Sequence, residues 1–401
     1  MNRPRTLVGS AVPLVLLIGL VGFVPAAAAS GAPPEEDESR ALLLLRRAVV
    51  AATSLGYSGT QVVMSWRPDG ESARLVDVRQ WPDGRRVETL RDAADAVAPA
   101  GGAGAAPSRS SSTSRTVGAS RGAPERALAL RALDVLATSY RLQVGGRAWV
   151  AGRAATTVTV LRGEAVAARL WVDDRTGLLL RQEVNDAAGN VRRMFAFIEI
   201  RPGSPGGTAA GAPSSVPVAD RRIPDAGPSR AHAVTGAFVH AQRVPQAAAS
   251  GSSGWQRAAS DSQRRGWCAS VECPAALPAG FRLLDVRRGT ASGAPVVQLV
   301  YGDGLSSISV FQQSGQLDPE QLTGFRADTW DGARVYVGEG WPQRLTWQGG
   351  PRVFTAVSDA AAPDLHAAIS TFPQDRTETD GGPFAAIGRG MHSVLEWLQG
   401  D

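Results

Sequence analysis

The chain contains no lysine, so all 42 of its basic residues are arginines. A phosphate-binding P-loop requires a lysine after its glycine-rich turn, and that class of nucleotide site is therefore excluded. An abundance of alanine, glycine and arginine without lysine more often reflects the base composition of a genome than binding to nucleic acid. We therefore expect no nucleic-acid partner, although the net charge of +5 favours contact with anionic lipid or an acidic partner.

Histidine is also scarce, and the 4 histidines are His232, His240, His366 and His392. None of them stands in an H-x-H or H-x-x-x-H pattern, so the sequence gives little support to a metal centre or a catalytic triad. The segment "GASRG", Gly118 to Gly122, matches the nucleophile-elbow pattern of hydrolases. That elbow needs a strand before it, and low-complexity sequence precedes this one. We predict no enzyme, no metal and no cofactor, with a hydrolase acting through Ser120 as the distant alternative.

Long apolar runs are absent except for one near the N-terminus. Arg3 and Arg5 precede an apolar stretch from Leu7 to Val24, and small residues follow it. This pattern predicts a cleaved secretory signal peptide over residues 1–29 and hence an exported, periplasmic or extracytoplasmic protein. A retained membrane anchor is the alternative, which Pro13 and Gly19 inside the run disfavour.

The chain has 2 cysteines, Cys268 and Cys273, in the segment "WCASVECP". In an oxidising compartment a pair at this spacing predicts a disulfide. A two-ligand metal site is the alternative, but no histidine or third cysteine lies nearby.

The segment 35–202 has the pattern of one α+β domain. Apolar residues recur at helical spacing from Arg40 to Leu55, and a second helix is predicted from Pro124 to Tyr140. About eight strands in hairpins accompany them, including a hairpin predicted to turn at Gly145-Gly146. Alanine, glycine, serine and proline dominate residues 98–120, which predicts a disordered insertion. We expect one curved antiparallel sheet, a half-barrel, folded over the helices.

A second, smaller α+β domain is predicted over residues 266–373, with strands between turns and a short closing helix. Residues 203–265 are rich in proline, glycine, alanine and serine and predict a linker between the two domains. In the tail, residues 374–401, apolar residues are spaced to form one face of a helix. That helix is expected to dock on the protein's own core, with partner or membrane binding as the alternative.

Several stretches in both blocks carry a resemblance to a known family. They are "LGYSGTQVV", "WVAGRAATTVTV" and "LWVDDRTGLLLRQEVNDAAGNVRRMFAFIEI" in the first block, and "ALPAGFRLL", "LVYGDGLSSISVF" and "RVYVGEG" in the second. With these stretches the chain resembles the RseB/MucB family of sigma-E regulatory proteins of bacterial envelopes. The two blocks stand in the family's order and are separated by a linker.

The resemblance implies a fold and a function. The family's first domain is similar to the lipoprotein carriers LolA and LolB, with a curved sheet over helices and an apolar cavity. Its second domain helps to hold the extracytoplasmic segment of an anti-sigma factor and so protects that factor from proteolysis. Envelope lipid is thought to release the factor. The alternative function is that of a lipid or lipoprotein carrier of the cell envelope that uses the same cavity.

Two sets of residues are candidates for these contacts. The aromatic residues proposed to line a cavity for an acyl chain are Tyr57, Trp66, Trp171, Phe195 and Phe197. Each of them is an ordinary core residue in the competing interpretation. The residues proposed to bind the anti-sigma partner are Tyr301, Asp303, Leu305, Ile308 and Phe311. Their segment could pair edge-to-edge with a partner or form an internal hairpin, and the hairpin is favoured.

Overall fold

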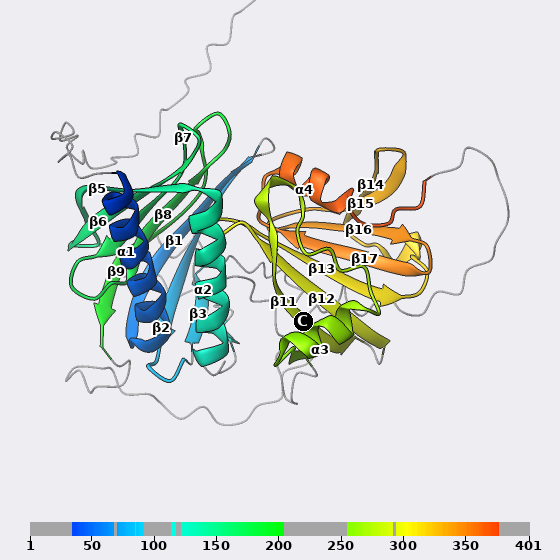
Figure 1. The fold of residues 1–401 in the computed structure, drawn as a ribbon, viewed down its shortest axis with the longest axis horizontal. Helices are drawn as coiled ribbons and strands as arrows, with labels where there is room; N and C mark the ends of the chain where they lie inside the picture. Colours follow the sequence, from blue (N-terminus) through cyan, green and yellow to red (C-terminus); the bar gives the residue numbers. More distant parts are fainter. Residues whose placement is uncertain are drawn as a thin grey trace, which may run out of the picture. The chain divides into compact units, whose positions relative to one another are not determined.

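The computed structural model describes residues 34–67, 70–84, 86–91, 114–117, 122–203, 255–291 and 294–376. These residues belong to one compact unit that contains two antiparallel sheets (Figure 1). The predicted signal peptide at 1–29, Ser120 of the "GASRG" pattern and the predicted tail helix beyond residue 376 lie outside the described residues.

The first sheet has nine strands in the order β4-β3-β2-β1-β9-β8-β7-β6-β5. They are β1 (Tyr57–Arg67), β2 (Gly70–Gln80), β3 (Arg86–Arg91), β4 (Ser114–Val117), β5 (Arg141–Val150), β6 (Arg153–Arg162), β7 (Ala165–Asp173), β8 (Leu179–Asn185) and β9 (Val191–Pro202). Two meanders join where β9 pairs antiparallel with β1, so β4 and β5 lie at opposite edges of an unclosed sheet. The predicted curved antiparallel sheet is confirmed.

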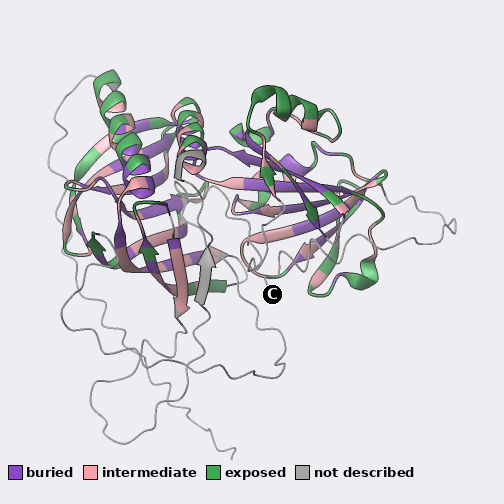
Figure 2. Cartoon of the chain, turned by 90° about the horizontal axis from the view of Figure 1, so that it is seen from below, coloured by how far each residue is buried: buried purple, intermediate pink, exposed green. Residues whose placement is uncertain are grey.

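Two helices pack on this sheet, α1 (Pro34–Ser54) and α2 (Gly122–Ser139). The chain returns from one edge strand, β4, to the other, β5, through α2, and α1 packs against both α2 and β5. The buried residues of α1 recur at helical spacing, which gives the helix one apolar face: Ala41, Leu45, Ala48, Val49 and Ala52. Figure 2 shows the outward faces of the helices exposed and the strands beneath them largely buried.

The second sheet has eight strands in the order β10-β11-β12-β13-β17-β16-β15-β14. They are β10 (Gln256–Arg257), β11 (Arg282–Ala291), β12 (Ala294–Gly302), β13 (Ser307–Ser314), β14 (Phe325–Trp330), β15 (Ala333–Gly338), β16 (Gln343–Gly349) and β17 (Arg352–Ser358). Its helical elements are α3 (Asp261–Cys268), η2 (Pro278–Gly280), η3 (Pro319–Gln321) and α4 (Ala362–Ile369). The predicted second α+β block is therefore present. Within the described residues, no helix combines the length and the apolar character needed to cross a membrane.

Aromatic side chains and α4 form the core of the second sheet. Trp347 and Phe354, on neighbouring strands, stack with ring centroids 5.3 Å apart, and the Trp347 indole N–H donates to the Pro373 carbonyl at 3.0 Å. Leu365 and Ile369 of α4 are fully buried against this core. Each such apolar side chain contributes about 1.5–3 kcal/mol on burial, so α4 holds one face of the sheet in place.

A disulfide joins Cys268, the last residue of α3, to Cys273. The loop between them packs partly against the core of the second sheet through Val271. A crosslink over so short a loop removes little entropy from the unfolded chain, so its main effect is to fix this loop locally.

The hairpin predicted at Gly145-Gly146 turns elsewhere. β5 runs through both glycines, which lie in a bulge where the register to β6 shifts between Val144 and Arg147. The turn is formed by Ala151 and Gly152, whose φ angles of 51° and 71° are both positive, as a two-residue hairpin turn requires. A glycine pair is a signal for a bulge as much as for a turn, and the sequence pattern did not separate the two.

Two predicted boundaries also differ from the structure. Ser114–Val117, inside the predicted disordered insertion 98–120, forms strand β4 and pairs with β3. Its threonine and valine favour extended backbone, and the free edge of β3 supplies the pairing. The second block begins within the predicted linker 203–265, because Gln256–Arg257 pairs with β11 and α3 starts at Asp261.

The position of the β5–β6 turn can be tested with two glycine substitutions. A Cβ at Gly146 or at Gly152 meets no atom within 4 Å, but only Gly152 has a positive φ. We expect Gly152→Ala to lower the free energy of unfolding by about 1 kcal/mol and Gly146→Ala to change it by less than about 0.5 kcal/mol. Urea unfolding of both variants measures this, and a larger loss for Gly146→Ala would place the turn at the glycine pair.

Candidate functional site

The tip of the β12–β13 hairpin is fixed by one buried carboxylate. Oδ1 of Asp303 accepts hydrogen bonds from the backbone N–H groups of Leu305, at 2.8 Å, and Ser306, at 2.6 Å. Such a bond pattern closes an Asx turn, which aspartate favours because its side chain reaches the backbone two residues on. The hairpin tip is therefore held in one conformation.

This tip contacts the core of the first sheet. Leu305 is 3% exposed and belongs to the apolar cluster that includes Leu136 and Leu133 of α2. Gly304, with φ +92°, lies so close to α2 that a Cβ there would be 2.4 Å from Cβ of Leu136. Only glycine satisfies both the backbone angle and this close approach. A residue of the second sheet thus completes the core of the first.

The other carboxylate oxygen of Asp303 accepts hydrogen bonds from side chains of the first domain, one of them just after the end of α2. The Tyr140 hydroxyl donates to Oδ2 of Asp303 at 2.6 Å, and the Arg162 guanidinium bonds to both the Tyr140 hydroxyl and, at 3.3 Å, Asp303. Burial, together with the Asp303 charge, raises the pKa of Tyr140 well above its usual range, so the hydroxyl remains a donor. Burial alone would lower the pKa of Arg162, but Tyr140 and Asp303 outweigh it and the pKa is raised.

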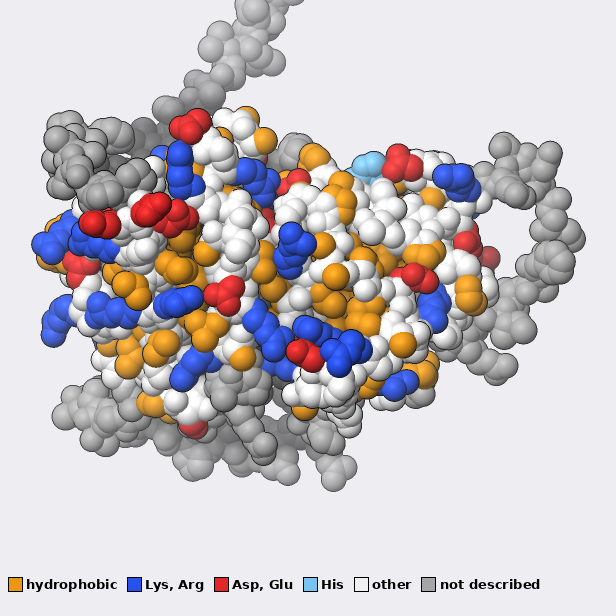
Figure 3. All heavy atoms as spheres, viewed as in Figure 1, with side chains coloured by type: hydrophobic (Ala, Val, Ile, Leu, Met, Phe, Trp, Pro, Cys, Tyr) orange, Lys and Arg blue, Asp and Glu red, His pale blue; other side chains and the backbone are white. Residues whose placement is uncertain are grey.

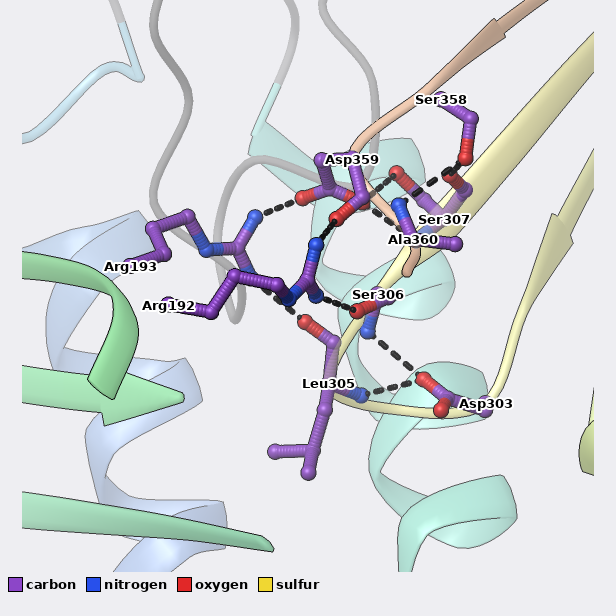
Figure 4. A network of polar contacts seen from close by, with 9 residues as sticks. All are labelled: Arg192, Arg193, Asp303, Leu305, Ser306, Ser307, Ser358, Asp359 and Ala360. Carbon is purple, nitrogen blue, oxygen red and sulfur yellow. Dashed lines mark hydrogen bonds and ion pairs between the residues drawn. The ribbon is translucent and has the colours of Figure 1, made fainter. Parts of the chain in front are cut away.

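An ion pair with a buried arginine and a partly buried aspartate joins β9 to the end of β17 (Figure 4). The Arg193 guanidinium bonds to Oδ2 of Asp359 and donates to the Leu305 carbonyl at 2.7 Å. Oδ1 of Asp359 accepts from the backbone N–H of Ser307 at 2.6 Å. The Arg193 side chain is 5% exposed. Burial and the adjacent charge of Arg192 lower the pKa of Arg193 to about 9, and the charge of Asp303 opposes that shift, so Arg193 is still a cation at neutral pH. Asp359 is the carboxylate in direct contact with it.

Arg192 adds contacts beside this pair. Its guanidinium donates to the Asp359 carbonyl at 2.7 Å and to the Ser306 hydroxyl at 3.3 Å. The guanidinium carbon also lies 5.8 Å from the ring centroid of Trp341, within the range of a cation–π contact. Burial lowers the pKa of Arg192, and the charge of Asp303 opposes that shift. Two consecutive arginines of β9 therefore bond to the same two loops of the second sheet.

Helix α2 has apolar residues on both of its sides. Leu133 and Leu136 belong to the core of the first sheet, whereas Leu128 and Ala132 pack with Leu284 and Val300 of β11 and β12. Arg131 also donates to the Leu284 carbonyl at 3.1 Å. We call the contacts of α2, Tyr140, Arg162, Arg192 and Arg193 with the second sheet the junction. The junction combines buried apolar side chains with hydrogen bonds from both arginines of β9, although Nε of Arg192 is buried without a partner.

The predicted cavity residues divide into two groups, of which the first lies in the core. Tyr57 and Phe197 are buried with ring centroids 5.9 Å apart, edge to face, and the Tyr57 hydroxyl accepts a bond from Arg86 at 2.8 Å. Phe195 is half-buried and contacts both apolar clusters of the first sheet. These three rings therefore share one region of the sheet's face.

The second group contains the two tryptophans. Trp171 alternates with the buried Leu170 and Val172 along β7, and the Arg181 guanidinium lies over its ring at 4.8 Å. Trp66 is half-buried near the end of β1, opposite Glu71 of β2. Binding of an acyl chain by these side chains stays a prediction.

The predicted partner-binding residues lie inside the protein. Tyr301, Ile308 and Phe311 are at most 2% exposed within the second sheet. β13 is hydrogen-bonded to β12 on one side and to β17 on the other, so the segment is the internal hairpin and not an edge. Asp303 and Leu305 belong to the junction. Contact of these five residues with a partner stays a prediction, and it would require the junction or the second sheet to open.

Sequence reasoning missed the arginines of the junction. The "VRRMF" stretch places Arg193 at the same side of β9 as Phe195 and Phe197, and a charge at an inward strand position is the one signal that could have marked it. Its partner Asp359 is 166 residues away in the chain, and no local pattern connects them.

Part of the chain is similar to a known family. Residues 41–225 match the family model described as the MucB/RseB N-terminal domain. The chain resembles the MucB/RseB family. The resemblance inferred from the sequence is thereby confirmed, and the first sheet with its two helices is the part of the chain that we call the MucB/RseB-like domain. No curated protein matches the chain in sequence.

Solved structures show similar chains at low identity. MucB in complex with MucA(peri) is 21% identical, and the match covers 84% of this chain and 99% of that one with a TM-score of 0.41. The Pseudomonas aeruginosa MucA/MucB complex is 19% identical over 85% of this chain and 100% of that one, with a TM-score of 0.40. A LolA superfamily protein from Nitrosomonas europaea is 11% identical over 40% of this chain and 92% of that one, with a TM-score of 0.16.

The close approach of Gly304 to α2 can be tested by adding one methyl group. We expect Gly304→Ala to destabilise the protein by about 3 kcal/mol, because the new Cβ forces the hairpin tip away from the MucB/RseB-like domain. Gly315→Ala is the control, since Gly315 also has a positive φ, +145°, but has no atom within 4 Å of a new Cβ. Equal effects of the two substitutions in thermal or urea unfolding would contradict the contact.

The buried ion pair predicts a loss when one charge is removed. Asp359→Asn leaves Arg193 buried without a counter-charge and should lower the free energy of unfolding by about 3 kcal/mol. Adding Arg193→Met to that variant should recover part of the loss, because the unpaired cation is then gone. The control is Glu199→Gln at the exposed Arg201–Glu199 pair, which should cost less than about 1 kcal/mol. A loss at Asp359 no larger than at Glu199 would show that the pair is not buried.

Proposed function

We propose that the chain is an exported regulator of an extracytoplasmic-function stress response that binds the outer segment of an anti-sigma factor and protects it from proteolysis. The observation that carries this proposal is the match of residues 41–225 to the MucB/RseB N-terminal domain. One similar structure, MucB in complex with MucA(peri), suggests the kind of partner. The protein acts by binding and not by catalysis.

The junction supports a binding role that uses both sheets. Because the hairpin tip, Arg193 and Asp359 hold the sheets together before any partner arrives, a bound segment can contact both without first ordering them. Preorganisation of this kind increases affinity by lowering the entropy lost on binding. A partner that touches both sheets would therefore bind more tightly than one that touches either sheet alone.

An extended anti-sigma segment can form main-chain hydrogen bonds only with a strand at the edge of a sheet. Since β13 is internal, the edges of the two sheets among the described strands are β4 and β5 in the first and β10 and β14 in the second. Addition of a strand to such an edge supplies regular main-chain hydrogen bonds. β5, with 10 residues, is the longest of these edges and is the one we propose for an extended partner segment.

Lipid sensing would act through the same junction. Leu305 of the second sheet and Phe195 of the first belong to one apolar cluster. An acyl chain that entered this cluster would compete with Leu305, and each methylene it buried would contribute about 0.8 kcal/mol against the junction. Release of the hairpin tip would then weaken the hold on the anti-sigma segment. A lipid or lipoprotein carrier remains the alternative function, with the same lipid site and no anti-sigma partner.

Calorimetry with the outer segment of a membrane-spanning anti-sigma factor from the same cell tests the proposal. We expect residues 32–401 to bind the segment and to slow its cleavage by an envelope protease. Gly304→Ala should weaken binding at least tenfold, or about 1.4 kcal/mol, because it separates the two sheets, while Gly315→Ala should not change it.

The same comparison in cells supplies an independent readout. The chain carrying Gly304→Ala should raise sigma-dependent transcription relative to the chain carrying Gly315→Ala. Absence of binding to the segment together with unchanged reporter output would contradict the regulator. Uptake of a fluorescent fatty acid in the same preparation would then favour the carrier.

A further inference from the structure

One end of the first sheet exposes a large aromatic side chain. Trp149, next to the last residue of β5, is 78% exposed, the highest value among the large apolar side chains in the described part of the chain. It alternates with the buried Val150, so its ring points away from the core. A tryptophan ring suits an interface between an apolar and an aqueous phase, because its body is apolar and its N–H can stay hydrated.

Arginines surround the turn that lies beside this strand. Arg147, two residues before Trp149 and on the same side of β5, is 86% exposed and lies 3.8 Å from Asp174 in the β7–β8 turn. Arg175 of that turn is exposed. Arg47 of α1 donates to the carbonyls of Asp174, at 3.2 Å, and Arg175, at 2.7 Å. Three elements thus bring Arg47, Arg147, Arg175 and Trp149 to one end of the sheet, which we call the basic end surface.

Helix α1 extends this surface with apolar side chains. Leu43 and Val50, 65% and 44% exposed, lie four residues before and three residues after Arg47. Residues at these spacings share one helical face. An arginine flanked by two exposed aliphatic side chains on a helix is an arrangement that suits the boundary between lipid headgroups and acyl chains.

The charge of this surface is positive. Asp174 is the acidic residue within it, and it is paired with Arg147 and accepts a bond from Thr156. Asp173, the neighbouring carboxylate, is 1% exposed and paired with Arg153. The acidic residues near the start of α1 end at Glu38, about 13 Å along the helix from Arg47, which exceeds the screening length of about 8 Å in physiological salt. Figure 3 shows acidic side chains over the start of α1 and basic ones over β5 and β6.

We propose that the basic end surface docks on anionic membrane lipid. Arginines pair with lipid phosphates, and the Trp149 ring enters the interfacial region where tryptophan is most stable. The apolar side chains stand singly among arginines on different elements, which is how interfacial residues insert one by one into a headgroup layer. This contact goes beyond anti-sigma binding, because it would place the protein on the membrane that carries its partner.

Vesicle sedimentation of residues 32–401, which omit the apolar N-terminal stretch, tests the proposal. We expect binding to vesicles of phosphatidylglycerol with phosphatidylcholine, weakening with added salt, and none to phosphatidylcholine alone. Trp149→Ala should lower the partition coefficient about tenfold, and Arg147→Glu with Arg175→Glu at least about tenfold. All three side chains are exposed, so the variants should keep the unfolding midpoint of the parent chain.

Matched controls keep the test specific. Ile198→Ala removes another exposed apolar side chain, 56% exposed on β9, and Arg326→Glu with Arg334→Glu makes the same charge change on the second sheet. Both controls should bind vesicles like the parent chain. Absence of binding to anionic vesicles, or an equal loss in the controls, would overturn the proposal. Unchanged vesicle binding with weaker binding of the anti-sigma segment would show instead that the surface contacts protein.

Discussion

The buried pair between Arg193 and Asp359 is the interaction on which the arrangement of the two sheets depends. A guanidinium that is 5% exposed has lost nearly all of its hydration, and the Asp359 carboxylate, 14% exposed, compensates for that loss. The carboxylate belongs to the other sheet. The cost of separating the two sheets therefore includes the cost of leaving a charge unpaired in an apolar interior, in addition to the exposed apolar area.

Around this pair, several further contacts also join the second sheet to the first domain, each through a different interaction. Leu305 is buried in the core of the first sheet, and Gly304 lets the backbone of the tip approach α2 closely. The Asp303 carboxylate bonds to Tyr140 and Arg162. Because these contacts share the short β12–β13 tip, they form or break together. A ligand that competed with this tip for the core of the first sheet would therefore favour an open arrangement over the closed one seen here.

The sequence was sufficient for the elements and insufficient for their long-range pairing. The apolar residues of α1 recur at helical spacing, and those of "LWVDD" and "FAFIEI" alternate as in strands. Both patterns indicate that one side of each element is buried, so the curved sheet over helices could be predicted. The same alternation does not indicate which other segment covers a side chain, so the burial of Leu305 and Phe311 within the chain could not be predicted. Their contact with a partner stays a prediction. The prediction of a turn at Gly145-Gly146 was wrong for a related reason. Glycine permits several backbone conformations, and its neighbours in the fold decide among them.

Hydrogen exchange at the hairpin tip is the most direct test of the claim that this tip is built into the first domain. The amides of Leu305 and Ser306 donate to the Asp303 carboxylate, and those of Ala188 and Asn190 donate in the same way to Asp186 in an exposed turn. The two turns share their local hydrogen bonding and differ in burial. We expect Leu305 and Ser306 to exchange as slowly as core amides of β9, far more slowly than Ala188 and Asn190. Equal, rapid exchange at both turns would contradict it.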